Sequence, residues 1–288
     1  MSSLFGTDSL NSLKLGSQNI STAYLGDQLV YTTAQSAPVA TWFPDNLTGL
    51  QCWLDAADND TIYDNDTGRV GQWVDKSGSG HNFSQSLVTQ QPLHSNSSIV
   101  FDGTDRLSNS TIEFDDAYIW GDTTTGHSVF VVAKSTGDDV SRLLCSPVEP
   151  RFFFGGGITA GDNNFVVAYG NTSRNYHSTS ALTPVTSLSS TNILSVVNTQ
   201  DTQTTPYVNG SNLSSINGEM LAFTGLNIGA GSYSTVDGTW NGDVNEIVIF
   251  KRQLDSADRN KVEGYLAHKW GLTQNLPTGH PYKSSAPV

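Results

Sequence analysis

The residues of this chain with the clearest capacity for chemistry are its carboxylates. Enzymes that cleave glycosidic bonds use two of them, one as nucleophile or base and the other as acid, on either side of the bond. No glutamate has a second one within five residues of it; the glutamates are Glu113, Glu149, Glu219, Glu246 and Glu263. Asp243 and Glu246 make the nearest approach to a pair. The spacing therefore predicts no catalytic residues and no enzymatic activity.

A run of aspartates could hold a metal ion. The run comprises Asp55, Asp58, Asp60, Asp64 and Asp66, and it ends in Asp-Asn-Asp-Thr-Gly. Calcium takes about six to eight oxygen ligands, which carboxylates and backbone carbonyls supply. The run lacks the loop and the closing glutamate of an EF-hand, so a solvated hairpin turn is the favoured interpretation. If calcium binds as a cofactor, Asp60, Asp64 and Asp66 are the candidate ligands.

The histidines and cysteines of the sequence predict no metal site. The six histidines are scattered, and no pair has zinc-like spacing. Cys52 and Cys145 each stand in an apolar setting. Two buried free thiols are therefore favoured over a disulfide.

Aromatic residues in polar loops are candidates for glycan binding. Sugar faces stack on aromatic rings, while asparagine and aspartate side chains hydrogen-bond hydroxyl groups. Trp120, Tyr176 and Tyr233 stand in stretches rich in Asn, Asp and Gly. We expect these three to contribute to a glycan site if there is one.

The composition narrows the class of protein. Of 288 residues only 14% are charged, and Gly, Ser, Thr, Asn and Asp are abundant, which is typical of strands and turns. The net charge of −13 disfavours nucleic acid and anionic membranes as partners. No run of about 18 apolar residues is present, so no membrane insertion is expected. The first residues lack the pattern of a secretory signal.

The first 36 residues differ from the rest. Leu13–Ile20 and Ala23–Tyr31 predict two related short strands, each with a Leu-Gly pair. Two strands alone are marginal in water, so we expect this segment to dock on another subunit. A flexible leader is the alternative. The expected assembly contacts are Leu15, Ile20, Tyr24, Leu25, Leu29 and Tyr31. Residues 37–41 predict a linker, and residues 42–288 the main domain.

The main domain predicts an all-β fold of two antiparallel sheets. Residues 49–57 predict a strand with Cys52 and Trp53 on opposite faces. Residues 127–135 are apolar on both faces, as in a central strand. Asn209-Gly210 predicts a type I′ hairpin turn. A helix is expected over residues 256–270, capped by Asp255 or Ser256 and stopped by Gly271.

Three motifs occur in a fixed order: Trp53-Leu-Asp-Ala, then Trp73-Val-Asp-Lys-Ser-Gly, then Phe101-Asp-Gly-Thr-Asp-Arg-Leu. With the closing strand, the helix and the His280-Pro-Tyr tail, this order resembles laminin-G-like domains of the concanavalin A-like lectin/glucanase superfamily. The resemblance covers roughly residues 45–282. It implies a jelly-roll sandwich, a structural role for Glu246 and, in many members, one calcium ion at the rim.

The version with a final helix and tail resembles copies in marine bacterial and phage proteins, and the N-terminal segment resembles phage tail and virion proteins. These resemblances imply a multi-copy, non-enzymatic structural protein of a tailed-phage virion: a tail appendage, fibre or capsid decoration. It would assemble in the host cytoplasm, dock on other virion proteins through residues 1–36, and expose a sandwich. That sandwich either binds host-surface glycan or is a purely structural decoration domain. The alternative is a carbohydrate-binding adhesin module of a bacterial surface or secreted protein.

Overall fold

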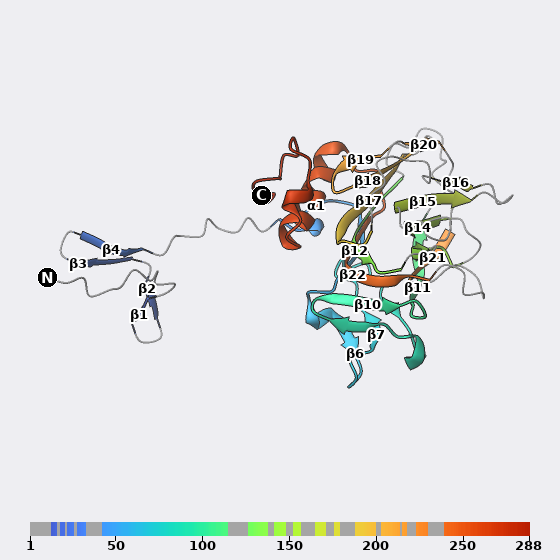
Figure 1. Ribbon diagram of the computed structural model, residues 1–288, viewed down its shortest axis with the longest axis horizontal. Helices are drawn as coiled ribbons and strands as arrows, with labels where there is room; N and C mark the ends of the chain where they lie inside the picture. Colours follow the sequence, from blue (N-terminus) through green and yellow to red (C-terminus); the bar gives the residue numbers. More distant parts are fainter. Residues whose placement is uncertain are drawn as a thin grey trace. The chain divides into compact units, whose positions relative to one another are not determined.

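The computed structural model describes residues 13–15, 18–20, 22–25, 28–32, 42–114, 126–137, 141–147, 152–156, 165–170, 176–178, 188–199, 203–213, 215–217, 223–229 and 239–288. The chain divides into two compact units, Met1–Thr41 with Val288, and Trp42–Pro287. Each is described by itself (Figure 1). The boundary at Trp42 coincides with the predicted start of the main domain.

The N-terminal unit contains two antiparallel hairpins. In the first, β1 (Leu13–Leu15) pairs with β2 (Gln18–Ile20), and in the second, β3 (Thr22–Leu25) pairs with β4 (Gln28–Thr32). The sequence predicted a single strand in place of each hairpin. The two residues between the paired strands are Gly-Ser in one hairpin and Gly-Asp in the other, and a leading Gly is typical of two-residue hairpin loops. The sequence also predicted a polar turn after each Leu-Gly pair, and the strand registers place the reversal of the chain at that point in both hairpins.

The first sheet of the sandwich is antiparallel, with β12 and β22 at its centre. Its strands in spatial order are β19 (Ser211–Asn212), β18 (Gln203–Val208), β17 (Asn192–Thr199), β12 (His127–Ser135), β22 (Asn241–Phe250), β10 (Ser98–Asp102) and β9 (Leu93–Ser95). In addition, β20 (Ile216–Asn217) pairs with β18, and β5 (Leu50–Asp55) pairs with β22. β10 lies along the first half of β22, and β5 lies along the second half.

The second sheet is also antiparallel and faces the first (Figure 1). Its strands in spatial order are β16 (Tyr176–Ser178), β15 (Phe165–Gly170), β14 (Phe152–Gly156), β13 (Ser141–Cys145), β21 (Phe223–Ile228), β11 (Leu107–Phe114), β8 (Phe83–Ser84), β7 (Val70–Trp73) and β6 (Ile62–Asp64). The predicted fold, a two-sheet antiparallel jelly-roll sandwich, is confirmed.

Two hydrophobic cores hold the layers together. Along β12, Val129 and Val131 point into the core between the sheets, whereas Phe130 and Val132 belong to a second core outside the first sheet. This alternation follows from the two-residue period of a strand. The strand is buried on both faces, as its doubly apolar sequence predicted. Cys52 and Trp53 of β5 divide between the two cores in the same way, which confirms the prediction that they lie on opposite faces.

The second core is closed by α1 (Ser256–Lys269), which covers the outer face of the first sheet (Figure 1). The Asp255 carboxylate accepts a hydrogen bond from the backbone N–H of Asp258 at 2.8 Å and so caps the first turn. Val262 and Leu266 are fully buried on the face toward the sheet. Gly271, with a φ of 69°, follows the helix end. The predicted helix is confirmed to within one residue.

Several smaller predictions also hold. Asn209 and Gly210 have φ values of 50° and 78° and join β18 to β19, which confirms the predicted hairpin turn. Cys52 and Cys145 are buried free thiols. Short 3₁₀ turns complete the sandwich: η1 (Pro44–Asn46), η2 (Asn59–Thr61), η3 (Val88–Gln90) and η4 (Thr273–Asn275). Within the described ranges, no helix has the length and apolar character needed to cross a membrane.

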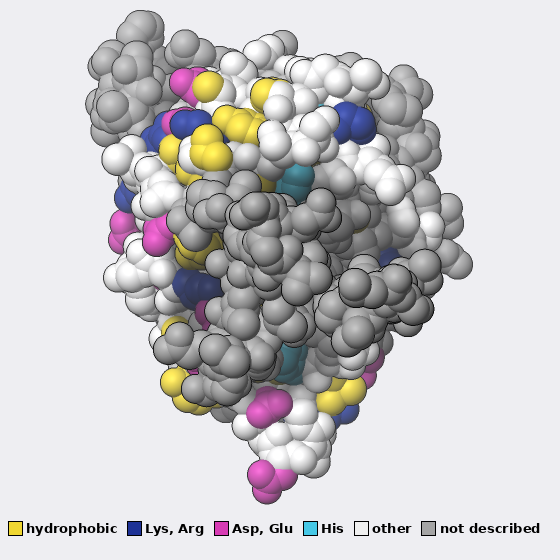
Figure 2. All heavy atoms as spheres, turned by 90° about the vertical axis from the view of Figure 1, so that its left-hand side faces the viewer, with side chains coloured by type: hydrophobic (Ala, Val, Ile, Leu, Met, Phe, Trp, Pro, Cys, Tyr) yellow, Lys and Arg dark blue, Asp and Glu magenta, His cyan; other side chains and the backbone are white. Residues whose placement is uncertain are grey.

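The surface mixes charges of both signs. On the face shown in Figure 2, lysine and arginine side chains stand among aspartates, glutamates and small hydrophobic groups. Ion pairs such as Arg252–Asp258 at 2.7 Å illustrate this mixture. Because ion pairs at the surface contribute little free energy, the two hydrophobic cores are the main source of stability.

Candidate functional site

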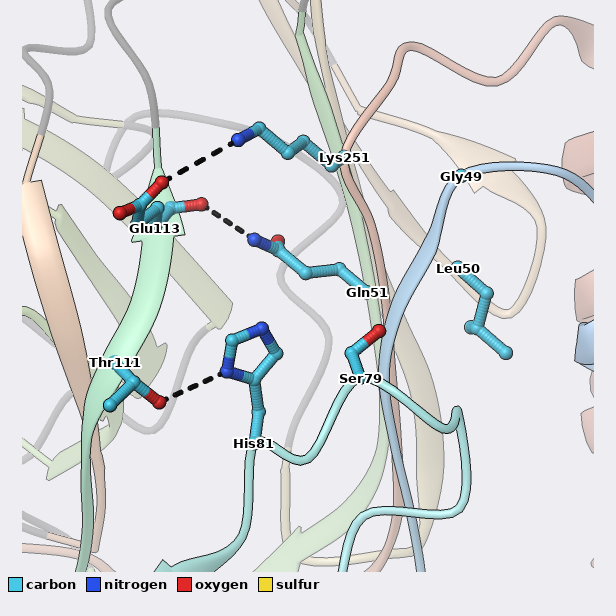
Figure 3. Close-up of a pocket in the computed structure, with 8 residues that line it drawn as sticks. All are labelled: Gly49, Leu50, Gln51, Ser79, His81, Thr111, Glu113 and Lys251. Carbon is cyan, nitrogen blue, oxygen red and sulfur yellow. Dashed lines mark hydrogen bonds and ion pairs between the residues drawn. The ribbon is translucent and has the colours of Figure 1, made fainter.

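An open pocket lies at the side of the sandwich, where the start of β5 in the first sheet faces β11 in the second (Figure 3). We call it the β5–β11 pocket. Its volume is about 480 Å³, within the range that small ligands occupy. It is lined by Gly49, Leu50, Gln51, Ser79, His81, Thr111, Glu113 and Lys251. These residues come from four separate segments, so the pocket is a product of the tertiary fold.

The loop that supplies one wall is folded by a buried carboxylate. Asp75 Oδ1 accepts hydrogen bonds from the backbone N–H groups of Trp53 and Ser77, both at 2.8 Å. Asp75 Oδ2 accepts one from Ser77 Oγ at 2.8 Å and one from the backbone N–H of His81 at 3.0 Å. Gly78, with a φ of 84°, allows the tight turn. The Trp-Val-Asp-Lys-Ser-Gly motif thus ties the loop to β5 and places His81 at the pocket wall.

Two hydrogen bonds cross the pocket between its walls (Figure 3). Gln51 Nε2 donates to the backbone carbonyl of Glu113 at 2.7 Å. The Nδ1 atom of His81 lies 3.2 Å from Thr111 Oγ1. At the mouth, Lys251 Nζ lies 3.8 Å from Glu113 Oε2. Polar groups held by both sheets therefore form part of the pocket wall.

One acceptor at the pocket is unsatisfied. Gln51 is only 7% exposed, and its Oε1 has no hydrogen-bond partner among the described residues. The bond from Nε2 to the Glu113 carbonyl fixes which way the amide faces, because a flipped amide would set two oxygens against each other. A buried carbonyl without a donor costs about 1–3 kcal/mol. Gln51 lines the pocket, but the Oε1 atom itself has almost no accessible surface, so a ligand donor reaches it only where the pocket wall yields.

The imidazole of His81 lies beside a group of hydrogen-bonded side chains. Asn109 Oδ1 accepts the backbone N–H groups of Thr111 at 2.8 Å and of Ile112 at 2.7 Å, and the Thr111 hydroxyl lies 3.3 Å from the same oxygen. Because the two N–H groups already occupy that oxygen, the Thr111 hydroxyl can either donate to Nδ1 of His81 or accept from it.

The charged pair at the mouth is weakly coupled. The Glu113 side chain is 61% exposed and the Lys251 side chain 40% exposed. An exposed pair at this distance contributes little free energy, so a ligand that separates the two charges loses little stabilisation from the ion pair.

A buried thiol lies behind the pocket wall. Cys52 Sγ lies 4.0 Å from the backbone carbonyl of His81. Burial raises the pKa of Cys52, and the nearby carboxylate of Asp75 raises it further. The thiol therefore stays protonated and is a structural group, not a nucleophile.

Glu246, the carboxylate closest to a catalytic pair in the sequence, is a structural centre. It is fully buried. Its Oε1 accepts hydrogen bonds from Trp53 Nε1 at 2.7 Å and from Tyr265 OH at 3.0 Å. Its Oε2 accepts from Trp270 Nε1 at 2.6 Å and lies 2.8 Å from Lys269 Nζ. Burial raises the pKa of Glu246 and of Tyr265. The structural role that the family resemblance implied is confirmed: Glu246 joins the first sheet to α1.

The other member of that sequence pair has separate partners. Asp243 Oδ2 lies 2.9 Å from Lys134 Nζ, on the neighbouring strand β12. Asp243 and Glu246 thus share no partner among the contacts of the described residues. The absence of enzymatic activity stays a prediction.

The aspartates predicted to bind calcium are exposed and spread along a hairpin. Asp60 lies in η2, Asp64 ends β6, and Asp66 lies in the turn before β7. Their neighbour Asp58 accepts the backbone N–H of Asp60 at 3.2 Å, and this side chain pairs with Lys76 at 2.6 Å. Within the described part of the chain, no three His, Cys, Asp or Glu side chains gather closely enough to hold a metal ion. The calcium prediction therefore gains no support.

The other predicted site residues fall largely outside what the structure describes. Trp120 and Tyr233 lie outside the described residues, and Tyr176 lies in β16 but its side chain is not described. The predicted assembly contacts lie in β1 to β4, again without described side chains: Leu15, Ile20, Tyr24, Leu25, Leu29 and Tyr31. Both sets stay predictions.

Sequence reasoning missed the polar lining of the β5–β11 pocket. Gln51, Thr111 and Lys251 are ordinary residues in strands or next to them, with no motif around them. The one available signal was the Asp75 motif, whose loop leads directly to His81. That motif indicated the fold, but pairing it with β11 required the structure.

Comparisons with known proteins identify a fold and no family. No protein-family model matches the chain, and no curated protein sequence matches it. Solved structures do match. The binding domain of Paraclostridial Mosquitocidal Protein 1 gives a TM-score of 0.54 over 77% of this chain, at 11% identity. Trypanosoma rangeli sialidase in complex with 2,3-difluoro-KDN gives a TM-score of 0.53 over 77% of this chain, at 13% identity.

This chain spans 53% of the first of those chains and 33% of the second. At such low identity the likeness shows the fold alone. It places the Trp42–Pro287 unit in the class of jelly-roll β-sandwich domains, in agreement with the two sheets described above.

Proposed function

We propose that this chain is a carbohydrate-binding β-sandwich module without catalytic activity, and that the β5–β11 pocket is its binding site. The observation that carries the proposal is the unsatisfied acceptor Gln51 Oε1 in an open pocket of about 480 Å³. Polar groups from both sheets surround it. Hydroxyl groups of a sugar both donate and accept hydrogen bonds, so they suit such a lining.

Two further observations support the proposal. One structural neighbour is named as a binding domain, and another was solved with a bound ligand. In addition, Glu113 is the one carboxylate among the lining residues that the structure describes. Glycoside hydrolysis needs two carboxylates around the bond, so this pocket supports binding without cleavage.

The setting that we propose is a multi-copy particle. The N-terminal segment resembles virion proteins, and its two hairpins form a unit separate from the sandwich. Isolated hairpins are marginal in water, which favours docking on another virion protein or on a second copy of this chain. The module would then act as an outward domain of a tailed-phage virion. An adhesin module of a bacterial surface or secreted protein has the same binding function in a different setting.

A glycan array probed with the full-length protein in multimeric form tests the proposal. We expect binding to at least one glycan class, with a weak affinity for single copies that multivalency raises. Binding to no glycan would contradict the proposed function. Hydrolysis of a bound glycan on incubation would contradict the absence of catalysis.

A further inference from the structure

The residues that line the β5–β11 pocket indicate which kind of sugar it would bind. The inference drawn from them rests on the proposed function. Two acceptors belong to its lining, the unsatisfied Gln51 Oε1 and the carboxylate of Glu113, and the imidazole of His81 lies beside them. Opposite them stands the ammonium group of Lys251. A matching ligand must therefore offer several hydrogen-bond donors and at least one acceptor.

The charges at the pocket restrict the class of ligand that fits it. A carboxylate on the ligand could replace Glu113 beside Lys251, but it brings acceptors only and would face the Gln51 and Glu113 oxygens. The whole chain, at −13, adds a repulsive field. A cationic ligand would suit the acceptors but would face Lys251. Neutral hydroxyl groups meet both requirements, because each one can donate to an acceptor and accept from the ammonium group.

The shape and lining favour a single unit. The lining residues include no Trp, Tyr or Phe, so the described walls offer no flat ring on which a chain of sugars could stack. These walls can therefore recognise a ligand through hydrogen bonds to one sugar residue, which would be held between β5 and β11 (Figure 3). A terminal residue of a glycan fits this arrangement.

We propose that the β5–β11 pocket binds one neutral, terminal sugar residue through adjacent hydroxyl groups. Glu113 and Gln51 accept from these hydroxyls, and Lys251 donates to one of them. Glu113 and Lys251 separate to either side of the sugar, so their ion pair is exchanged for contacts with the ligand.

The test uses the full chain and a panel of methyl hexopyranosides, the matching uronic acids and 2-amino-2-deoxy sugars, titrated by NMR. We expect a neutral glycoside to shift the Gln51 side-chain amide and the backbone amides of His81 and Thr111. Glu113→Gln and Lys251→Met should each weaken binding about tenfold or more, as loss of a charged hydrogen-bond partner does.

The chain offers two matched controls. Lys261 on α1 lies 3.8 Å from Asp258, the same separation as in the Lys251–Glu113 pair, and it is similarly exposed. Asp45 is an exposed carboxylate in η1. Lys261→Met changes the net charge as Lys251→Met does, and Asp45→Asn changes it as Glu113→Gln does; both controls should bind like the unmodified chain. A general charge effect would change binding in each control as much as in its matched pocket variant and would overturn the pocket assignment.

The remaining outcomes are also decisive. If the array shows glycan binding but Glu113→Gln and Lys251→Met bind normally, the pocket assignment is wrong and the proposed function stands. If uronic acids or amino sugars bind at the pocket as tightly as neutral sugars, the ligand class is wrong. If the unmodified chain binds no glycan at all, the proposed function and this inference fail together.

Discussion

At the scale of single residues, the two carboxylates that could have formed a catalytic pair differ sharply in environment. Glu246 is buried under four donors from β5, α1 and the helix end, whereas Asp243 forms one partly exposed ion pair. We therefore expect the Glu246 carboxylate to contribute much to the free energy of unfolding and the Asp243 carboxylate to contribute little.

This contrast gives a prediction for paired variants. Glu246→Gln places an amide N–H₂ against donors and takes one of two carboxylate partners from Lys269, which keeps Asp55 at 2.7 Å. We expect it to lower the free energy of unfolding by about 3 kcal/mol or more, as broken buried pairs do. Asp243→Asn should change it by about 1 kcal/mol or less. Urea denaturation measures both. Equal losses in the two variants would show that Glu246 is not the structural centre described here.

A second residue-scale prediction concerns pH. Asp105 is 1% exposed; its Oδ2 accepts the backbone N–H of Asp102 at 3.1 Å, and Arg69 lies 3.7 Å from its Oδ1. Burial raises the pKa of Asp105 from 3.8 to about 6. The folded chain therefore keeps a proton that the unfolded chain releases near pH 4. Its contribution to stability is complete below that pH and is lost as the pH rises through about 6.

Asp105→Asn removes this titration. The free energy of unfolding of the unmodified chain, minus that of the variant, should fall by about 2–3 kcal/mol between pH 4 and pH 7. Chemical denaturation at several pH values gives the difference directly. A constant difference across that range would mean that Asp105 is ionised normally in the folded chain.

At the scale of elements, α1 and the C-terminal tail form one packed unit. His280 Nε2 lies 3.3 Å from the buried Glu263, and His268 Nε2 lies 2.9 Å from the Tyr282 backbone carbonyl. Gly264, in the middle of the helix, lies directly under the Tyr282 ring. A glycine in a helix interior normally costs stability relative to alanine, and here it makes room for the tail.

We therefore expect Gly264→Ala to destabilise the domain although alanine favours helix. The new Cβ would overlap Tyr282 Cβ and stand 2.8 Å from its Cγ. Overpacking of this kind costs about 1–3 kcal/mol, more than the helix gains. Limited proteolysis should cut the tail sooner. Gly279→Ala is the control, because a Cβ there meets nothing within 4 Å. If Gly264→Ala stabilises the domain, the tail is not packed as described.

The sequence allowed a good part of these elements to be predicted, for local reasons. A few neighbouring residues determine each of three features: the alternation along β12, the Asp255 cap and the Asn209-Gly210 turn. The N-terminal hairpins were misread as single strands because a two-residue turn barely interrupts an apolar pattern. The pocket could not be predicted, because Gln51 and Glu113 meet only through the packing of two sheets.

At the scale of the whole molecule, we predict separate roles for the two compact units. Unit boundaries at Thr41 and Trp42 leave the complete sandwich on one side. We expect deletion of residues 1–36 to leave the thermal unfolding of the sandwich unchanged and to abolish multimer formation or incorporation into a particle. Calorimetry and analytical ultracentrifugation measure the two effects. A truncated chain that still assembles would show that the docking surface lies elsewhere.

The pairing of β5 with β22 has a consequence for biosynthesis. Trp53 and Glu246, which meet across this pairing, are 193 residues apart in the chain. A ribosome must therefore make nearly the entire domain before its first long strand finds a partner, and contacts this distant in sequence form slowly. Because Gln51 and Lys251 lie side by side at one end of this pairing, the pocket cannot form before the chain has been made as far as Lys251. Display of the pocket thus reports that β22 has been synthesised and has paired with β5.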